Sequence, residues 1–371
     1  MNFYRYQIQN DIQRIFYPIN LAFTLLCASQ YKIRNNVIIP IGIIHICIWF
    51  SLVIIILILF AFNMYSSYYN EEDAIFSILS FLRAFYVIYC FTGYSMIFVS
   101  KVVNRSNSCR LLMMLQYINY NINSQRKVDE IIICNWIYAI STFAINIFAV
   151  SIFYALCGFD VINVMFDFSY INFDINIVHA ICILMMLTKY LNEWIKSVAL
   201  LEDQDIHGSH IGFKIAFQTY DAIIQTYNLS KNLFEVLILY YTVDTYCRVL
   251  LYCEAGLEEL KEQTHKSIAL SLMLLTFNWF VKNMIILVAL SVYCEKFYIK
   301  IEEARIACAQ LLKKTNYSNH QMDLYKKVLQ TNRTFSKMTA CGLFYIDAKL
   351  PIYLFLLITN HLIVLLQFYF L

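Results

Sequence analysis

The stretch that decides how this chain is organised is its last 22 residues, Leu350–Leu371, LPIYLFLLITNHLIVLLQFYFL. The stretch carries no charged side chain. A helix of this length, rising about 1.5 Å per residue, can cross a hydrocarbon core of about 30 Å. Asn360, His361 and Gln367 nevertheless interrupt it. Because polar groups are costly against lipid, we expect this helix to turn them toward protein or water.

The composition of the whole chain is that of a polytopic membrane protein. Hydrophobic residues make up 60% of the 371 residues and charged residues only 14%, and the mean hydropathy is +0.59. A soluble protein of this length needs more charge to cover its surface. The 12 cysteines match no zinc or haem spacing, so we expect buried free thiols and no metal or cofactor. Cys157 and Cys253 are the one pair worth testing for a disulfide.

Seven apolar stretches predict an all-α membrane protein with seven transmembrane helices. They are Val37–Phe62, Ala74–Ser100, Ile131–Phe159, Ile171–Leu187, Leu233–Tyr252, Ser267–Cys294 and Leu350–Leu371. The region from Lys101 to Lys127 is expected to be a polar connection. Phe16–Cys27 is apolar but short and interrupted by Pro18, so we expect an amphipathic or interfacial helix there.

Connections rich in lysine and arginine alternate with connections that have few or none, and this pattern predicts how the chain is oriented in the membrane. Four precede the first span, five follow the second and nine lie between residues 295 and 337, whereas the loops after the first and third spans contain none. The positive-inside rule then places the N-terminus in the cytosol and the C-terminus outside. The four Asn-x-Ser/Thr sequons agree, since all fall in predicted cytosolic segments: Asn104, Asn228, Asn316 and Asn332.

The predicted cytosolic segments carry helical patterns of their own. Within Phe297–Leu312, apolar residues recur on one face of a helix, which indicates that the sixth span continues into the cytosol. Met322–Val328 and Lys214–Tyr227 are expected to be further helices. These segments either build a cytosolic collar where subunits meet or are solvated charged helices.

The residues from Met338 to Phe368, MTACGLFYIDAKLPIYLFLLITNHLIVLLQF, resemble the C-terminal signature of insect gustatory receptors. That signature is Thr-Tyr, five hydrophobic residues and Gln-Phe within the seventh span. Here Gln367 and Phe368 end the motif, and residues 362–366 supply the five hydrophobic positions. Asn360 and His361 stand where Thr-Tyr is usual.

The resemblance implies a tastant-gated, non-selective cation channel whose seventh helix lines the pore. It implies a homotetramer, or a heterotetramer with related subunits, in the plasma membrane of sensory neurons, with membrane lipid and a small-molecule tastant as its other partners. The pore and gate residues would be Ile363, Leu366, Gln367 and Phe368. For Gln367 the alternative is an interhelical hydrogen bond, and for Phe368 an aromatic at the membrane interface. Leu362 replaces an acidic residue of the sugar-responsive branch, which counts against that branch.

On this interpretation the chain has four parts. Residues 1–36 form a cytosolic N-terminal segment, and residues 37–294 form the first six helices, with a ligand pocket in their outer half. Residues 295–337 form a cytosolic helical anchor, and residues 338–371 form the pore-lining helix with its cytosolic approach. Two alternatives stay open: an odorant-type subunit of the same fold, and a seven-span receptor that signals through a cytosolic partner without conducting ions.

Polar residues within the spans are the candidates for contacting ligand, since charge inside a membrane is costly and is usually functional. They are Arg83, Tyr86, Tyr154, His179, Asp244, Arg248, Asn278 and Lys282. The alternative for Asp244 and Arg248 is mutual neutralisation, because they lie four residues apart on one helix. Arg83 and Lys282 can also extend their charges to the interface.

Enzymatic and nucleic-acid-binding functions are disfavoured. His207 and His210 form a single pair without further metal ligands, and no catalytic residues are assigned. The chain contains no phosphate-binding loop, Gly-x-Ser-x-Gly or His-Glu-x-x-His motif. The basic residues between 295 and 337 alternate with acidic and apolar ones, which favours anionic lipid or a partner subunit over nucleic acid. No internal repeat of the kind found in transporters is evident.

Overall fold

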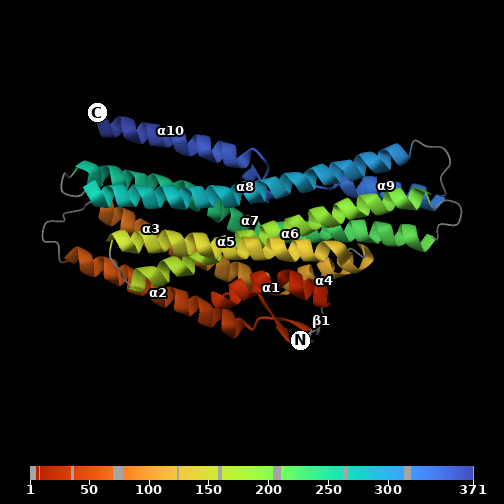
Figure 1. Cartoon of the computed structure of the whole chain (residues 1–371), viewed down its shortest axis with the longest axis horizontal. Coiled ribbons are helices and arrows are strands. Elements are labelled where there is room, and N and C mark those ends of the chain that lie inside the picture. The colour runs from red at the N-terminus through yellow and green to blue at the C-terminus, as the bar shows by residue number, and fades with distance from the viewer. Residues whose placement is uncertain are drawn as a thin grey trace.

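The protein is an elongated bundle of helices that run mostly along its long axis (Figure 1). The structure is a computed structural model, and it describes residues 6–7, 9–34, 37–69, 78–122, 125–157, 161–203, 210–261, 266–312 and 319–370. The helices are α1 (Asn10–Leu25), α2 (Ile43–Tyr69), α3 (Ile78–Val103), α4 (Arg105–Ile122), α5 (Gln125–Cys157), α6 (Val161–Asp203), α7 (His210–Lys261), α8 (Lys266–Leu311), α9 (Asn319–Arg333) and α10 (Leu350–Phe370). The strands are β1 (Tyr6–Gln7), β2 (Tyr31–Arg34), β3 (Val37–Pro40), β4 (Thr339–Ala340) and β5 (Phe344–Tyr345).

The predicted all-α class with seven spans is confirmed. Among the described residues, six helices are long and apolar enough to cross a membrane, and the bent pair α3–α4 makes seven if it is counted as one span. The polar connection predicted from Lys101 to Lys127 contains a helix that the sequence analysis did not predict. The chain bends by 64° after α3 and continues as α4. The apolar residues of α4 are buried against α7, although the segment as a whole is polar. The helix was not predicted because the polar composition outweighed this apolar stripe.

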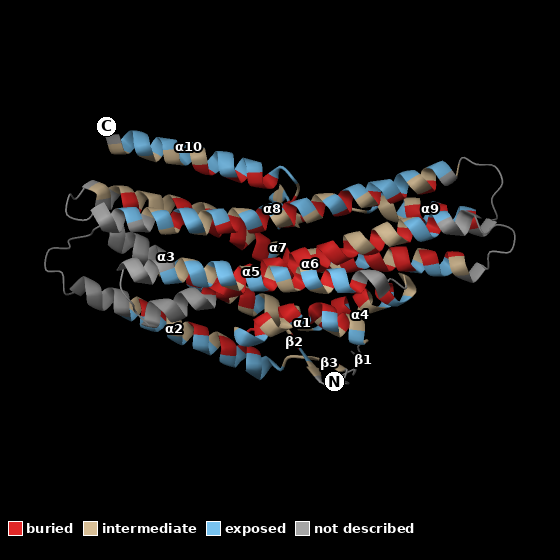
Figure 2. Ribbon diagram, viewed as in Figure 1, coloured by how far each residue is buried: buried red, intermediate tan, exposed pale blue. Residues whose placement is uncertain are grey.

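Helix α6 is the centre of the bundle (Figure 2). Its apolar window within Tyr170–Ala199 is 94% buried, against 22% for the corresponding window of α10. Apart from Asn176 and His179, the stretch Ile175–Leu187 is apolar on every side, and such a helix can be buried all round. Helices α2, α5, α7 and α8 pack against it.

Helices α7 and α8 are much longer than a bilayer requires, with 52 and 46 residues. The predicted continuation of the sixth span is confirmed, because α8 runs on to Leu311. Its predicted stripe, including Phe297, Ile301 and Cys308, is buried, and α8 packs there on α9 and α7. The helix predicted at Lys214–Tyr227 is the first part of α7 rather than a separate element.

The N-terminal elements pack against the helical bundle. Helix α1 begins at Asn10 and is amphipathic, as one of the two predicted alternatives has it, and its apolar face packs on α5 and α6. Asn135 of α5 donates a 2.8 Å hydrogen bond to the Ile15 carbonyl. The three short strands form an antiparallel sheet in the order β1-β3-β2. Because β3 ends at Pro40 and Gly42 follows, the first span begins at Ile43 and not at Val37.

Helices α3 and α7 approach each other closely at Gly93. A β-carbon built there would lie 2.2 Å from Cζ of Tyr240. The Tyr240 ring is held between Tyr89 and Phe173, with ring centroids 5.1 Å away on each side, so it has little room to move.

We therefore expect Gly93→Ala to force the two helices apart and to destabilise the protein by about 1–3 kcal/mol. Its melting temperature in detergent should fall clearly below that of the wild type. Gly42→Ala is the matched control, because no atom lies within 4 Å of a β-carbon at that position. Equal melting temperatures for the two variants would contradict this account of the α3–α7 contact.

Candidate functional site

Four helices meet at a buried carboxylate, Asp174 of α6. Lys282 of α8 lies 2.7 Å from Oδ2 of Asp174, and Asn146 of α5 donates to the same oxygen at 2.9 Å. Tyr241 of α7 donates to the other oxygen, Oδ1, at 2.9 Å. Asp174 is 0% and Lys282 5% exposed. We call these four residues the Asp174 network.

The Asp174 network extends along α7 and α8 through neutral groups. The Tyr241 hydroxyl also lies 3.0 Å from Oδ1 of Asn283. The amide of Asn283 in turn donates to the Thr245 hydroxyl at 3.0 Å. Both carboxylate oxygens of Asp174 therefore have partners, as a buried charge requires.

A second buried ion pair lies farther along α7. Nε of Arg248 donates to Oδ1 of Asp244 at 2.9 Å, and the Tyr170 hydroxyl donates to the other carboxylate oxygen at 2.5 Å. The guanidinium carbon lies 3.8 Å from the centroid of the Tyr170 ring and 5.1 Å from that of Trp279. Such cation–π contacts stabilise a desolvated guanidinium. We call Asp244, Arg248, Tyr170 and Trp279 the Arg248 cage.

Aromatic rings continue from the Arg248 cage toward α3. Phe173 lies beside Tyr170, with centroids 4.8 Å apart, and stacks on Tyr240. Tyr240 stacks on Tyr89, and the Tyr94 ring packs against Phe173 with centroids 5.0 Å apart. The cage and these rings join α3, α6, α7 and α8 around one pair of charges.

Three of the residues predicted to contact ligand come together in this region: Asp244, Arg248 and Lys282. Asp244 and Arg248 form the intrahelical ion pair that their spacing allows. Asn278 is exposed and does not join them. The side chains of Arg83, Tyr86 and Tyr154 lie outside the described residues.

His179 lies in a separate, apolar part of the core. Its ring packs edge-on against Phe16, Phe23 and Phe234, with centroids 5.9, 5.7 and 5.5 Å away. Neither of its ring nitrogens has a hydrogen-bond partner among the described residues. These contacts tie α1 to α6 and α7, which is a packing role.

Asp174, Asn146 and Tyr170 were not among the predicted site residues. Asp174 carried a usable signal, because an acidic residue within an apolar span is expected to have a buried partner. Asn146 lies in a span without charge, and Tyr170 precedes the predicted start of the fourth span. Nothing in the local sequence distinguishes these two from ordinary membrane-helix residues.

The last helix is held at its beginning by a tyrosine of α8. The Tyr298 hydroxyl accepts from the Met338 amide at 3.0 Å and donates to the Ile346 carbonyl at 3.1 Å, which fixes both ends of the β4–β5 hairpin. The hairpin turns at Cys341 and Gly342, both at positive φ, a conformation that favours glycine at the second position. Asp347 then accepts from the Lys349 amide at 3.0 Å just before α10 begins.

Helix α10 leaves the bundle as it proceeds (Figures 1 and 2). It contacts α7 and α8. The stripe that faces them passes from buried at its start to half-buried at its end: Pro351, Leu354, Ile358, Leu362, Leu365 and Tyr369. On the opposite side of the helix four residues, spaced four, three and four positions apart, are all exposed. We call them the outward stripe: Leu356, Asn360, Ile363 and Gln367. The polar side chains of Asn360 and Gln367 thus share a face that points away from the bundle.

The predicted pore residues are all exposed in the monomer. Ile363 and Gln367 belong to the outward stripe, while Leu366 and Phe368 flank it, and Phe368 is 74% exposed. His361 is placed differently from Asn360. Its ring packs edge-on against Tyr246 of α7 at 5.6 Å, and its Nδ1 lies 2.9 Å from the Leu357 carbonyl.

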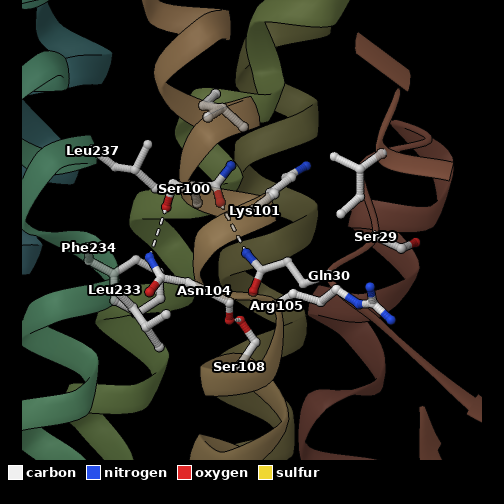
Figure 3. A pocket seen from close by; sticks show the side chains of 13 residues that line it. Ser29, Gln30, Ser100, Lys101, Asn104, Arg105, Ser108, Leu233, Phe234 and Leu237 are labelled. Atoms are coloured by element: carbon white, nitrogen blue, oxygen red, sulfur yellow. Dashed lines mark hydrogen bonds between the residues drawn. The ribbon is translucent and has the colours of Figure 1, made fainter. Parts of the chain in front are cut away.

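A small cavity of about 30 Å³ lies where α3 bends into α4 (Figure 3). It is lined by polar residues of several elements, including Gln30, Lys101 and Asn104. Gln30 donates to the side chain of Asn176 at 3.2 Å, and Asn104 to that of Ser100 at 3.5 Å. The cavity has room for about one water molecule, so it does not suit an organic ligand.

Comparisons with known proteins give a fold. A scan against protein-family models finds no match, and a search of curated proteins finds none either. Among solved structures, the chain is similar to the insect olfactory receptor OR5 from Machilis hrabei, in complex with eugenol. The TM-score is 0.66 at 13% identity, over 96% of this chain and 100% of that chain. The protein therefore has the fold of an insect olfactory receptor, and its long apolar helices make it a multi-pass membrane protein.

The Asp174 network generates a stability prediction. Lys282→Met should leave Asp174 buried without its cation and lower the free energy of unfolding by about 3–5 kcal/mol. Asp174→Asn combined with Lys282→Met should recover much of this loss, because the double variant buries no charge. The free energy of unfolding is measured in mixed micelles by titrating the protein with a denaturing detergent.

The matched control is Lys196→Met, which removes a surface ion pair with Glu193. A change within about 0.5 kcal/mol is expected there, since an exposed pair contributes little. If the double variant is as unstable as the sum of its two single variants, Asp174 and Lys282 are not coupled as described.

Proposed function

We propose that the chain is a gustatory-type receptor subunit, a tastant-gated cation channel formed by four copies of this chain or of related chains. Three observations support the proposal: the fold shared with an insect olfactory receptor, the Gln367-Phe368 ending of the terminal motif, and the exposure of α10. The orientation rests on the basic residues, which favour a cytosolic N-terminus. The proposal includes the four-part division of the chain predicted from the sequence, with boundaries at residues 36, 294 and 337.

The observation that carries the proposal is the outward stripe of α10. In lipid, the amides of Asn360 and Gln367 would be left without partners, which is costly. In a ring of subunits the same stripe faces the axis, where water and ions are present. Ile363 then contributes an apolar ring that closes the path by excluding water, and Gln367 an amide ring that receives a partly hydrated cation. Leu366 and Phe368 flank the stripe at the outer end of the helix.

In this proposal the tastant binds at the Arg248 cage and its aromatic neighbours. Asp244 and Arg248 lie on either side of Tyr246 in α7, and Tyr246 contacts His361 of α10. A ligand that alters the packing of α7 thereby alters the contact that positions α10. Only a ligand with different affinities for the closed and open states can shift their populations in this way.

An odorant-type subunit is the second candidate, favoured by the likeness to a receptor whose structure was determined with eugenol. Because both types share the fold, the ligand distinguishes them. A panel of tastants, with eugenol included, applied to cells that express the chain and scored by calcium entry, separates the two. The absence of the acidic residue at Leu362 favours tastants other than sugars.

Gln367→Ala should change ion permeation while leaving ligand recognition intact, because it removes the amide ring of the proposed pore. We expect altered relative permeability to sodium and calcium and altered rectification in excised patches, with a ligand concentration for half-activation within about twofold of the wild type. Leu362→Met, on the bundle-facing side of the same helix, should leave permeation unchanged. Unaltered permeation in both Gln367→Ala and Phe368→Ala would remove α10 from the pore.

A further inference from the structure

A groove of about 470 Å³ opens beside the N-terminal elements. The end of α1, the β2–β3 hairpin, the first turns of α2 and one residue of α3, Lys101, line it. Lys101 also lines the small cavity at the α3–α4 bend, where Figure 3 shows its side chain among polar groups. The groove lies on elements other than those that form the Arg248 cage and α10.

The groove is basic. Lys32, His45 and Lys101 contribute two ammonium groups and an imidazole, and within the described part of the chain no aspartate or glutamate lines it. The other polar lining residues are neutral: Asn20, Thr24, Ser29 and Tyr31. A site with this lining attracts an anion.

The side chain of Lys101 reaches the groove from α3. Its ammonium donates to the Ala28 carbonyl at 2.7 Å and lies 4.2 Å from the centroid of the Trp49 ring. Among the described residues, no carboxylate lies within ion-pair distance of it. Since an ammonium has three donors, Lys101 retains hydrogen-bonding capacity for a ligand oxygen.

The groove lies where a polar surface meets the start of a membrane helix. Helix α2 begins at Ile43, and its exposed apolar residues, including Ile44, Ile48 and Leu52, line a neighbouring hollow of about 370 Å³. Trp49, in the second turn of α2, lines the groove on its apolar side. A molecule in the groove would therefore have its charged end beside Lys32 and Lys101 and an apolar surface along α2.

We propose that this groove binds the head group of an anionic phospholipid, with an acyl chain lying along the exposed face of α2. The phosphate is bound by the ammonium groups of Lys32 and Lys101. The glycerol and head-group hydroxyls can be hydrogen-bonded by Thr24 and Ser29. A bound lipid joins α1, the hairpin and α2, and so stabilises the N-terminal elements by the free energy of binding.

The test uses the full chain, purified in detergent and freed of lipid. Phosphatidylglycerol and phosphatidylcholine with the same acyl chains are titrated separately, and the lipid-bound fraction is measured by native mass spectrometry. We expect the wild type to bind phosphatidylglycerol at least tenfold more tightly than phosphatidylcholine. Lys32→Gln should weaken phosphatidylglycerol binding about fivefold, the effect of one lysine near an anionic lipid. Lys101→Met should weaken it further.

Lys349→Gln is the matched control, because Lys349 is an exposed lysine at the start of another membrane helix, α10. It should leave phosphatidylglycerol binding within about twofold of the wild type. If Lys101→Met does not fold, the exposed Lys32 still decides the outcome. Equal binding of the two lipids by the wild type, or equal weakening by Lys32→Gln and Lys349→Gln, would overturn the proposal. Binding of glycerol 3-phosphate as tightly as of phosphatidylglycerol would also overturn it, since the ligand would then be a soluble phosphate.

Discussion

The ion pair between Asp174 and Lys282 joins α6 to α8 in a part of the bundle where both charges are shielded from water. A charge so placed must be paired, because its desolvation costs several kcal/mol. Asn146 and Tyr241 complete the hydrogen bonds, so that α5 and α7 are tied to the same carboxylate. These four helices therefore satisfy the hydrogen bonds of Asp174 in only one register, that is, at one position of each helix along its axis. Sliding α6 or α8 by one residue would separate the two charges, and sliding α5 or α7 would remove a hydrogen bond from the buried carboxylate.

The Arg248 cage and the helix α10 depend on this arrangement. Asp244 and Arg248 follow Tyr241 on α7 within two turns, and Trp279 precedes Lys282 on α8 within one. The position of Tyr246, which contacts His361, is therefore set by the same register. The bundle is fixed by buried charge, whereas α10 contacts it along one narrowing stripe. A rigid bundle with one weakly attached helix is an arrangement that a ligand can bias at modest cost in free energy.

Much of this fold could be predicted from the sequence, since apolar length and the spacing of apolar residues are local signals. They predicted the membrane helices and the extension of α8. They did not predict α4, because its mean hydropathy is polar although one stripe of the helix is apolar and buried. They also placed Val37–Pro40 in the first span, whereas these residues form a strand before it. The partner of a buried charge is not local: Asp174 and Lys282 are 108 residues apart. The ion pair of Asp244 and Arg248, by contrast, could be foreseen as the alternative to ligand contact, because the two residues lie four apart on one helix.

The central claim is that the outward stripe of α10 faces water in the assembled protein. It is tested most directly by single cysteine substitutions along α10, treated with a charged, water-soluble thiol reagent while the ligand-evoked current is recorded. Cysteine at positions 356, 360, 363 and 367 should render the current sensitive to the reagent, while cysteine at 354, 358, 362 and 365 should not. The unsubstituted chain, which has exposed cysteines of its own at Cys27, Cys47 and Cys341, sets the background. Equal sensitivity of the two sets, or sensitivity confined to the bundle-facing set, would contradict the account.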